Sequence, residues 1–244
     1  MIPAQLLTAL RRARAVTALT GAGVSAESGI PTFRDAQTGL WAQYRPEELA
    51  TPDAFRNNPK LVWNWYAFRR KLVTEAAPNA GHCALARMEA LFTRFTLITQ
   101  NVDDLHARAG SRAPIELHGS IMQTRCFDEG TLVTRFEERG DDVPRCPRCG
   151  GFLRPGVVWF HEALPSAALA QARAASEQCD IFFSIGTSSV VYPAAELPLH
   201  AKTRGALLVE INPIATPLTP HADHVLAGTS ATILPELVAQ LGHE

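Results

Sequence analysis

Three of the five cysteines in the sequence are close enough together to bind a metal ion. Cys146 and Cys149 form a Cys-x-x-Cys pair, and Cys126 lies a short distance before it. An odd number of cysteines in a chain of 244 residues argues against a disulfide framework. Thiolates in such clusters are common zinc ligands. The cluster therefore predicts metal binding rather than oxidation.

A glycine-rich segment near the N-terminus has the residue types that bind phosphate groups. Gly21-x-Gly23-x-x-Ala26 follows the apolar run Val16–Leu19. Glycines at the end of a strand let the backbone approach a pyrophosphate, and a following helix start offers free N–H groups. An ordinary strand-to-helix turn is the alternative. A standard dehydrogenase also needs a second strand that ends in an acidic residue about 20 positions later. The sequence has no such strand, so nucleotide binding is predicted without a dehydrogenase.

Short apolar runs alternate with helical patterns along most of the chain. Such runs are typical of strands in a parallel sheet that is covered by helices on both faces. The predicted strands are Val16–Leu19, Phe95–Thr99, Ile115–Leu117, Val157–Phe160, Ile181–Ile185 and Ala206–Ile211. The sequence therefore predicts an α/β fold with a Rossmann-like parallel sheet.

Two segments interrupt this alternation. A long helical pattern from about Pro59 to Ala76 lies between the first two predicted strands. A polar stretch that contains the cysteine pair runs from Cys126 to about Phe152, and we interpret it as a small inserted module. An amphipathic helix is expected to begin at Pro3.

The composition is that of an ordinary globular protein, with 46% hydrophobic and 19% charged residues. The formal net charge of −1 gives no global field that would recruit nucleic acid or acidic membranes. No uncharged apolar stretch approaches the length of a membrane span. The basic residues near the N-terminus follow the apolar run, which is the wrong order for a secretory signal. We expect a soluble, cytoplasmic protein with no nucleic-acid or membrane partner; nothing in the sequence indicates an oligomeric state.

Five ordered motifs resemble the signatures of sirtuins, and the resemblance extends from about Thr17 to Leu237. The motifs are Gly21–Arg34 (GAGVSAESGIPTFR), Thr99–His106 (TQNVDDLH), His118-Gly119, Gly186–Ser189 (GTSS) and Ile211–Pro213 (INP). The resemblance implies one catalytic domain over residues 1–244. Its NAD-binding lobe would comprise approximately residues 1–34, 78–120 and 156–244. Its small lobe would comprise approximately residues 35–77 and 121–155, with a zinc-ribbon-like module.

The resemblance also implies an NAD-dependent removal of acyl groups from protein lysines, which yields nicotinamide, O-acyl-ADP-ribose and free lysine. His118 would be the general base, because a neutral imidazole is available near pH 7, and Asn101 would be the second catalytic residue. The implied NAD-binding residues are Gly21, Ala22, Gly23, Glu27, Thr32, Phe33, Arg34, Gln100, Asn101, Val102, Asp103, Gly186, Thr187, Ser188, Asn212 and Ser230. Without the resemblance, His118 would be interpreted as structural, and Asn101 and Asp103 as caps of a helix beginning near Val102.

Tyr66 and Arg69 are three positions apart in the long helical pattern, so a helix places them on one face. A phenol beside a guanidinium can hold a carboxylate. A surface arginine over an aromatic core stripe is the alternative. The pair is similar to the one with which class III sirtuins recognise succinyl-lysine and malonyl-lysine. Ala50 matches a position where a small residue enlarges the acyl pocket. We therefore expect a preference for acidic acyl groups, with acetyl also accepted.

The sequence departs from the sirtuin pattern at two places. The family usually has two Cys-x-x-Cys pairs, and here Glu129 stands at the fourth position. Zinc bound by three thiolates and a carboxylate is predicted, with a degraded site held by packing as the alternative. His161 stands where relatives usually have glycine, in the segment that faces the substrate. An acyl-lysine substrate is expected to add as a strand between two segments, with contacts from Val158, Phe160 and Val190.

Two other functions compete with deacylation. Some relatives with altered acyl pockets transfer ADP-ribose to protein, and the Tyr66 and Arg69 pair counts against that reaction. A non-catalytic zinc ribbon that binds nucleic acid is the second alternative. The near-neutral charge and the incomplete set of cysteines disfavour it.

Overall fold

The computed structural model describes the chain except for residues 1, 33–43, 138–139, 141 and 243–244. Its main element is a six-stranded sheet of the order β3-β2-β1-β6-β7-β8, in which all neighbouring strands are parallel. The strands are β1 (Ala15–Thr20), β2 (Arg94–Thr99), β3 (Ile115–Glu116), β6 (Ile181–Ile185), β7 (Leu207–Asn212) and β8 (His224–Ala227). The order reverses between β1 and β6, and this is the place where open α/β sheets bind ligands. The predicted fold class is confirmed.

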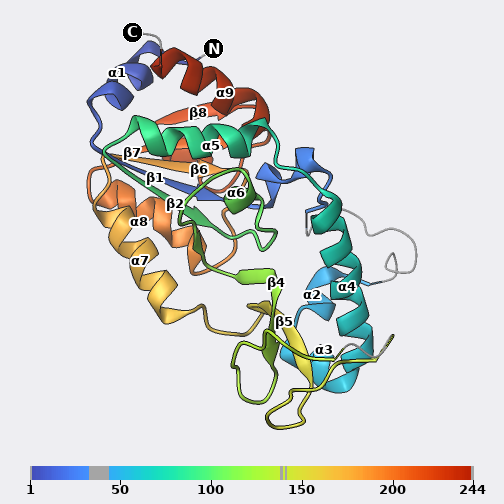
Figure 1. The fold of residues 1–244 in the computed structure, drawn as a ribbon. Helices are drawn as coiled ribbons and strands as arrows, with labels where there is room; N and C mark the ends of the chain where they lie inside the picture. The colour runs from blue at the N-terminus through green and yellow to red at the C-terminus, as the bar shows by residue number, and fades with distance from the viewer. Residues whose placement is uncertain (1, 33–43, 138–139, 141, 243–244) are drawn as a thin grey trace.

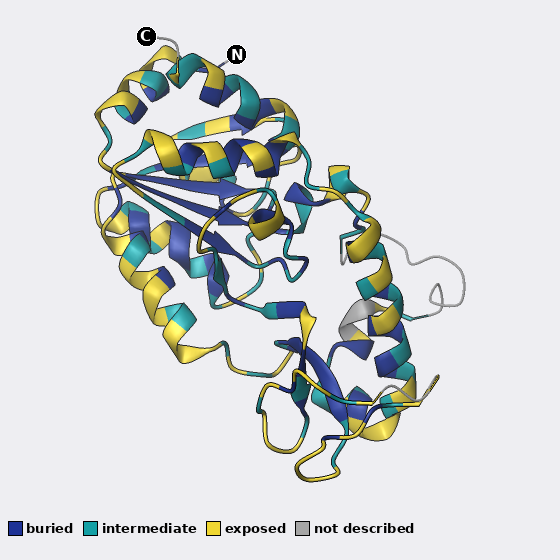
Figure 2. Cartoon of the chain, in the orientation of Figure 1, coloured by how far each residue is buried: buried dark blue, intermediate teal, exposed yellow. Residues whose placement is uncertain are grey.

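Helices cover both faces of this sheet (Figure 1). One face packs against α1 (Ala4–Arg12), α5 (Ala80–Leu91) and α9 (Ser230–Leu241), and the other packs against α7 (Ser166–Glu177) and α8 (Leu197–Thr203). Every residue of β1 and β6 is buried, which the dark central strands of Figure 2 show. Burial on both faces explains why these strands are continuous apolar runs in the sequence.

A second group of elements has its own hydrophobic core below the sheet in Figure 1. It contains α2 (Pro46–Leu49), α3 (Pro52–Asn57) and α4 (Pro59–Glu75), with the antiparallel pair β4 (Gly119–Cys126) and β5 (Leu153–Val157). A further small core joins this group to the segment that holds the cysteines. The division into two lobes stays a prediction, and these separate cores support it.

Short elements connect the larger ones. They are the 3-10 helices η1 (Ala22–Val24), η2 (Ala26–Ser28), η4 (Ala194–Glu196) and η5 (Thr219–His221), and the helix α6 (Leu105–Arg108). The helix expected near Val102 begins at Leu105, where the Asp103 carboxylate accepts a hydrogen bond from the Leu105 N–H at 3.1 Å.

One predicted strand is wrong, and three strands, β4, β5 and β8, were not predicted. Residues 158–160 lie outside any strand, and Val157 ends β5, which pairs with β4 rather than with the parallel sheet. The segment is apolar because it faces the core of the helical group: Val157 and Trp159 are buried there. β4 and β8 mix buried and exposed residues, so neither forms a long apolar run. No helix in the described part of the chain has the length and apolar character needed to cross a membrane.

Candidate active site

Two backbone loops cross where β1 and β6 end. The Gly21 N–H donates to the Ile185 carbonyl at 3.0 Å, and the Gly23 N–H donates to the Gly186 carbonyl at 2.9 Å. A Cβ on Gly21 would lie 2.8 Å from the Thr187 Cα, and one on Gly23 would lie 2.8 Å from the Gly186 oxygen. Only glycine tolerates this approach. The glycines predicted to bind a pyrophosphate are therefore required first for the packing of the two loops.

Side chains from neighbouring strand ends meet at Thr187. The Gln100 amide donates to the Thr187 hydroxyl at 3.0 Å, and the Asn212 amide donates to the Thr187 carbonyl at 2.8 Å. The backbone carbonyl oxygen of Gln100 contacts His118 Nδ1 at 2.9 Å. The structure thus brings together four of the residues predicted for the site, from segments far apart in the sequence.

The partner of His118 determines which of its ring nitrogens is basic. A carbonyl oxygen only accepts hydrogen bonds, so Nδ1 carries the hydrogen and Nε2 keeps its lone pair. Burial lowers the pKa of His118, and the hydrogen bond to the Gln100 carbonyl partly opposes this. The following Gly119 has φ +73°, and a Cβ there would overlap the Gly156 carbonyl oxygen. Glycine is therefore needed after the histidine for the start of β4.

Asn101 and Asp103 belong to a buried hydrogen-bond network centred on Ser25. The Ser25 hydroxyl donates to Asp103 at 2.7 Å and accepts from the Asn101 amide at 3.1 Å. His82 Nε2 lies 3.3 Å from the same hydroxyl, and the Asn79 backbone N–H donates to His82 Nδ1 at 3.3 Å. Since Nδ1 accepts, Nε2 of a neutral His82 donates to Ser25. The network fixes the orientation of both predicted site residues.

Burial shifts the pKa values of this network toward neutral forms. It raises the pKa of Asp103, although the Ser25 hydroxyl opposes the shift. It lowers the pKa of His82 to about 4 and that of His106 to about 3. The two imidazole rings lie 4.9 Å apart, and His106 Nε2 contacts the Thr20 hydroxyl at 2.9 Å. At neutral pH both histidines are uncharged.

Tyr66 and Arg69 are both buried in α4, with 3% and 9% of their surfaces exposed. The alternative interpretation of Arg69 as a surface residue is therefore wrong. Its guanidinium lies over the Trp65 ring, 5.1 Å from the centroid. The Tyr66 oxygen accepts a hydrogen bond from the Trp159 indole at 3.0 Å, and burial raises the pKa of Tyr66 to about 12. Ala50 is buried in the same core.

A small pocket lies beside the Arg69 side chain. It is formed between the segment after the glycine loop and one side of α4. Its lining residues are Ile30, Pro31, Phe68, Arg69, Leu72 and Val73. Arg69 is the charged residue in this otherwise apolar lining. Tyr66 lies on the same helix one turn before Arg69 but is not part of this lining.

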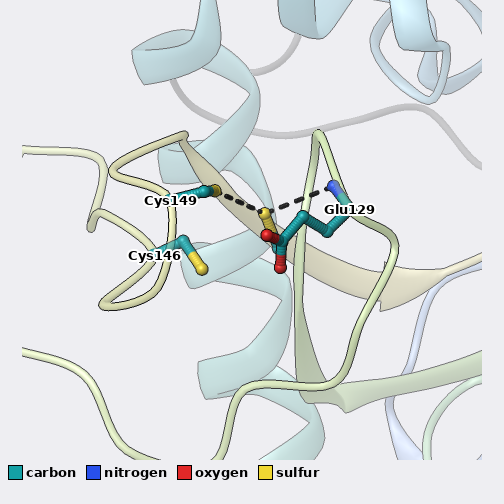
Figure 3. A group of neighbouring side chains, drawn as sticks. Glu129, Cys146 and Cys149 are labelled. Carbon is teal, nitrogen blue, oxygen red and sulfur yellow. Dashed lines mark hydrogen bonds between the residues drawn. The ribbon is translucent and has the colours of Figure 1, made fainter.

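Glu129, Cys146 and Cys149 converge from two loops (Figure 3), and Cys126 lies among them. One ligand atom from each residue lies within 4.8 Å of the others. The sulfurs of Cys126 and Cys149 are 3.4 Å apart, close to the separation of two thiolates on one zinc ion. The four residues form the predicted metal site, with Glu129 in the position of a fourth ligand.

The two loops repeat one backbone pattern. In each loop, the N–H of a glycine with positive φ donates to the carbonyl of a cysteine four residues earlier. Gly130 donates to Cys126 at 3.0 Å, and Gly150 donates to Cys146 at 2.9 Å. An arginine that precedes this cysteine donates to the carbonyl of the same glycine in both loops. The residue before the glycine is Cys149 in one loop and Glu129 in the other. The carboxylate therefore occupies the place that a thiolate has in the matching loop.

The other residues predicted to bind NAD lie around the glycine loop or are not described. Glu27 is exposed and accepts from the Ala231 N–H at 3.3 Å, at the start of the helix that contains the buried Ser230. The partly buried residues of the set include Ala22, Thr32, Val102 and Ser188. Phe33 and Arg34 lie outside the described residues.

The residues predicted to contact the substrate backbone lie on two exposed segments. The N–H groups of Val158 and Phe160 donate to the carbonyls of His118 and Ala50, at 2.8 and 2.9 Å. The Phe160 and Val190 side chains are 37% and 46% exposed. His161 is exposed with φ +71°, a conformation that explains why glycine suits this position.

Sequence reasoning missed several buried polar residues of the site. Ser25, His82 and His106 were not selected, although Ser25 lies within the glycine motif. The one available signal for His82 is its place three residues after Asn79, because the two form a capping box at the start of α5. Trp159 was also missed, since an apolar run does not indicate where an indole N–H points.

We predict that the free energy of unfolding falls as the pH drops from 6.5 to 4. Above pH 6.5 both histidines are neutral in the folded and unfolded states, so they contribute nothing. Below pH 6.5 both histidines of the unfolded chain bind protons. In the folded protein, His82 and His106 bind them only near their pKa values of about 4 and 3. Urea titrations across this range should show a loss on the order of 3 kcal/mol for each histidine.

The variant His82→Gln should take up about one proton fewer on unfolding in this pH range. The slope of its unfolding free energy against pH should fall accordingly. His221→Gln serves as the control, because His221 is exposed. The same slope in His82→Gln and in the unmodified protein would contradict the prediction.

Comparisons with known proteins agree with this geometry. The model of the Sir2 family matches residues 21–193. An "NAD-dependent protein deacylase" of Aquifex aeolicus is 54% identical over 85% of this chain and 87% of the relative. A protein of the same name from Methylococcus capsulatus is 51% identical over 97% of this chain and 96% of the relative.

Solved structures of similar proteins extend over nearly the whole chain. A structure described as a Sir2 homolog–NAD complex has a TM-score of 0.93 at 49% identity, and covers 99% of this chain and 94% of that one. A structure described as "Sir2-p53 peptide-NAD+" has a TM-score of 0.86 at 31% identity, with 99% of each chain covered. The sirtuin resemblance is confirmed: the chain belongs to the Sir2 family.

Proposed function

We propose that this chain is an NAD-dependent protein deacylase that prefers succinyl and malonyl groups on lysine and also accepts acetyl. The products are nicotinamide, O-acyl-ADP-ribose and free lysine. The observation that carries the preference is a buried arginine, Arg69, in the lining of an otherwise apolar pocket. The deacylase activity itself is supported by curated relatives of that name, which are about half identical over nearly all of the chain.

The edge of the sheet at β1 and β6 fits NAD. The strand order reverses there, and the crossing loops of Gly21, Gly23 and Gly186 have no side chains that would block a pyrophosphate. Gln100 and Asn212 place amide groups at the same edge. When bound, NAD supplies the ribose carbon that receives the acyl oxygen as nicotinamide leaves.

His118 acts as the general base. Its Nδ1 hydrogen is held by the Gln100 carbonyl, so Nε2 takes the proton of a ribose hydroxyl. A lowered pKa keeps this nitrogen unprotonated at neutral pH. Asn101 and Asp103, fixed through Ser25, orient the nicotinamide side of the site.

We predict that kcat/KM falls at acidic pH with an apparent pKa below the ordinary histidine value of about 6.5. The neutral base is the active form, and burial favours it, so activity rises with pH and reaches its plateau early. Replacing His118 with alanine should lower kcat by roughly 100-fold to 10,000-fold, while NAD still binds. Steady-state rates between pH 5 and 8 and calorimetric titration with NAD test this. An acid limb that persists in a partly active His118→Ala variant would show that another group is responsible.

Acidic acyl groups suit the residues on α4. The Arg69 guanidinium lies over the Trp65 ring, and the residue is only 9% exposed. A buried cation gains most from a ligand that brings a carboxylate. Tyr66 stays protonated at neutral pH because its pKa is about 12, so it can donate a hydrogen bond to the same group. An acetyl group fits but makes neither contact.

We predict a higher kcat/KM for a succinyl-lysine peptide than for its acetyl-lysine counterpart. The variant Arg69→Met should reduce the succinyl value by roughly 10-fold to 100-fold relative to acetyl, as expected for a charged hydrogen bond. Arg112→Met is the matched control, because Arg112 is an exposed arginine that pairs with Glu89 and is not part of the pocket lining. An unchanged ratio in Arg69→Met would contradict the acidic preference and leave an ordinary deacetylase.

Zinc fits the four converging residues. Three thiolates and one carboxylate make a tetrahedral donor set, and the repeated loop pattern directs Glu129 to the fourth place. The Glu129 and Gly151 N–H groups each lie 3.4 Å from a cysteine sulfur, as thiolate ligands require. Cys126, Cys146, Cys149 and Glu129 would hold the ion, which would serve to join the two loops.

We predict one zinc ion per chain, lost in Cys146→Ser. Glu129→Ala should weaken zinc binding at least tenfold, whereas Glu129→Cys should retain the ion or bind it more tightly, because thiolate is the usual donor at this place. Competition with a chromophoric chelator measures the affinities. Equal zinc retention in Glu129→Ala and in the unmodified protein would exclude the carboxylate as a ligand.

The peptide substrate adds as a strand between residues 158–160 and the segment around Val190. The support is the exposure of Phe160 and Val190, which lie on the two segments. A structural neighbour described with a p53 peptide and NAD supports peptide binding in this fold. Incubation with labelled NAD distinguishes ADP-ribosyl transfer, which would leave the label on protein, from deacylation, which would not.

A further inference from the structure

We propose that Trp159 is a positioning residue for acidic acyl groups. Its indole N–H binds the Tyr66 oxygen and thereby leaves the Tyr66 hydrogen free to be donated to the carboxylate of the acyl group. This inference rests on the proposed preference for succinyl and malonyl. It adds a residue that acts through Tyr66.

The hydrogen bond between Trp159 and Tyr66 can have only one direction. An indole N–H is a donor and never an acceptor, so the Tyr66 oxygen must accept. The two atoms are 3.0 Å apart, and the side chains are 2% and 3% exposed. Water therefore does not compete for the contact.

The hydrogen of the Tyr66 hydroxyl has no acceptor among the described residues. The one hydrogen bond of this hydroxyl in the described part of the chain is the one from Trp159. A buried hydroxyl that does not donate is unfavourable by roughly 1–3 kcal/mol. The pKa of about 12 means that the hydrogen is present at neutral pH. A ligand acceptor would remove this penalty, and the carboxylate expected beside Arg69 is such an acceptor.

Contacts to both the backbone and the indole ring fix the position of Trp159. Its backbone N–H donates to the Glu162 carboxylate at 2.8 Å. The Arg154 guanidinium lies over the indole ring, 3.4 Å from the centroid, and forms a bidentate ion pair with Glu162. Phe55 packs against the indole, with ring centroids 5.3 Å apart. The indole N–H direction is therefore fixed before any ligand binds, which is the condition for it to orient Tyr66.

The Trp159 hydrogen bond should affect only acyl groups that end in a hydrogen-bond acceptor. Succinyl and malonyl bring a carboxylate that accepts from both Tyr66 and Arg69. Acetyl has no such group. Loss of the Trp159 hydrogen bond would let the Tyr66 hydroxyl turn, and this lowers recognition of the carboxylate while the aromatic packing remains.

The test compares kcat and KM for matched succinyl-lysine and acetyl-lysine peptides in Trp159→Phe, which removes the N–H and keeps an aromatic ring. The expected result is a threefold to tenfold lower ratio of succinyl to acetyl kcat/KM, expressed mainly in the KM for succinyl. In a Tyr66→Phe background the same substitution should not change the ratio further. Trp63→Phe is the control, because Trp63 belongs to the core beside the cysteines.

An equal loss with both peptides, or an unchanged ratio, would overturn the role of Trp159. If Arg69→Met still abolishes the succinyl preference in that case, the proposed function stands without the inference. If the unmodified protein has no succinyl preference and Arg69→Met has no effect, the proposed function fails and the inference fails with it.

A second measurement needs no variant. In protein labelled with ¹⁵N-tryptophan and kept free of NAD, one indole N–H resonance should shift on saturation with the succinyl-lysine peptide. The acetyl-lysine peptide should not shift it, because Tyr66 then gains no acceptor. Identical indole spectra with both peptides would contradict the inference even if Trp159→Phe did not fold.

Discussion

The close approach of two backbone loops at the end of β1 and β6 is the constraint on which the site depends. A Cβ on Gly21 or Gly23 would lie within 3 Å of backbone atoms at Gly186 or Thr187. With the two loops this close, Thr187 receives both the Gln100 and the Asn212 side-chain amides. Gln100 then sets the tautomer of His118. One steric requirement at the switch point of the sheet thus fixes a chain of polar contacts that ends at His118.

The polar core beneath this edge is arranged at the expense of stability at low pH. His82 and His106 are buried without charge, and Asp103 is buried against the Ser25 hydroxyl, with Arg69 near enough to oppose the rise of its pKa. Such groups are retained only where they are hydrogen-bonded. Here the bonds of His82 run through Ser25 to Asn101 and Asp103, so this buried histidine contributes to orienting two predicted site residues. Apolar residues in these places would not hold the Asn101 amide and the Asp103 carboxylate in fixed orientations.

The parts of this fold that the sequence predicts are those with one dominant physical signal. β1, β6 and β7 are buried on both faces, so their apolar runs identify them. The segment 158–160 is equally apolar, but it packs on a different core, and a run of residues does not say which core it faces. The NAD edge and the cysteine loops could be predicted from motifs. The burial of Arg69 and the partner of Trp159 could not, since both depend on how α4 meets the end of β5.

The β4–β5 ribbon connects two sites that the sequence presents as separate. Gly119 pairs with Val157 at one end of the ribbon, next to His118 and Trp159, and Cys126 pairs with Leu153 at the other end. A two-stranded ribbon alone is marginally stable in water. Its far end is held by the two cysteine loops, and its near end by the packing of Trp159 between Arg154 and the aromatic residues of the small core. The cysteine loops therefore act on the site through geometry alone: they anchor the strands whose opposite ends lie next to His118 and Trp159.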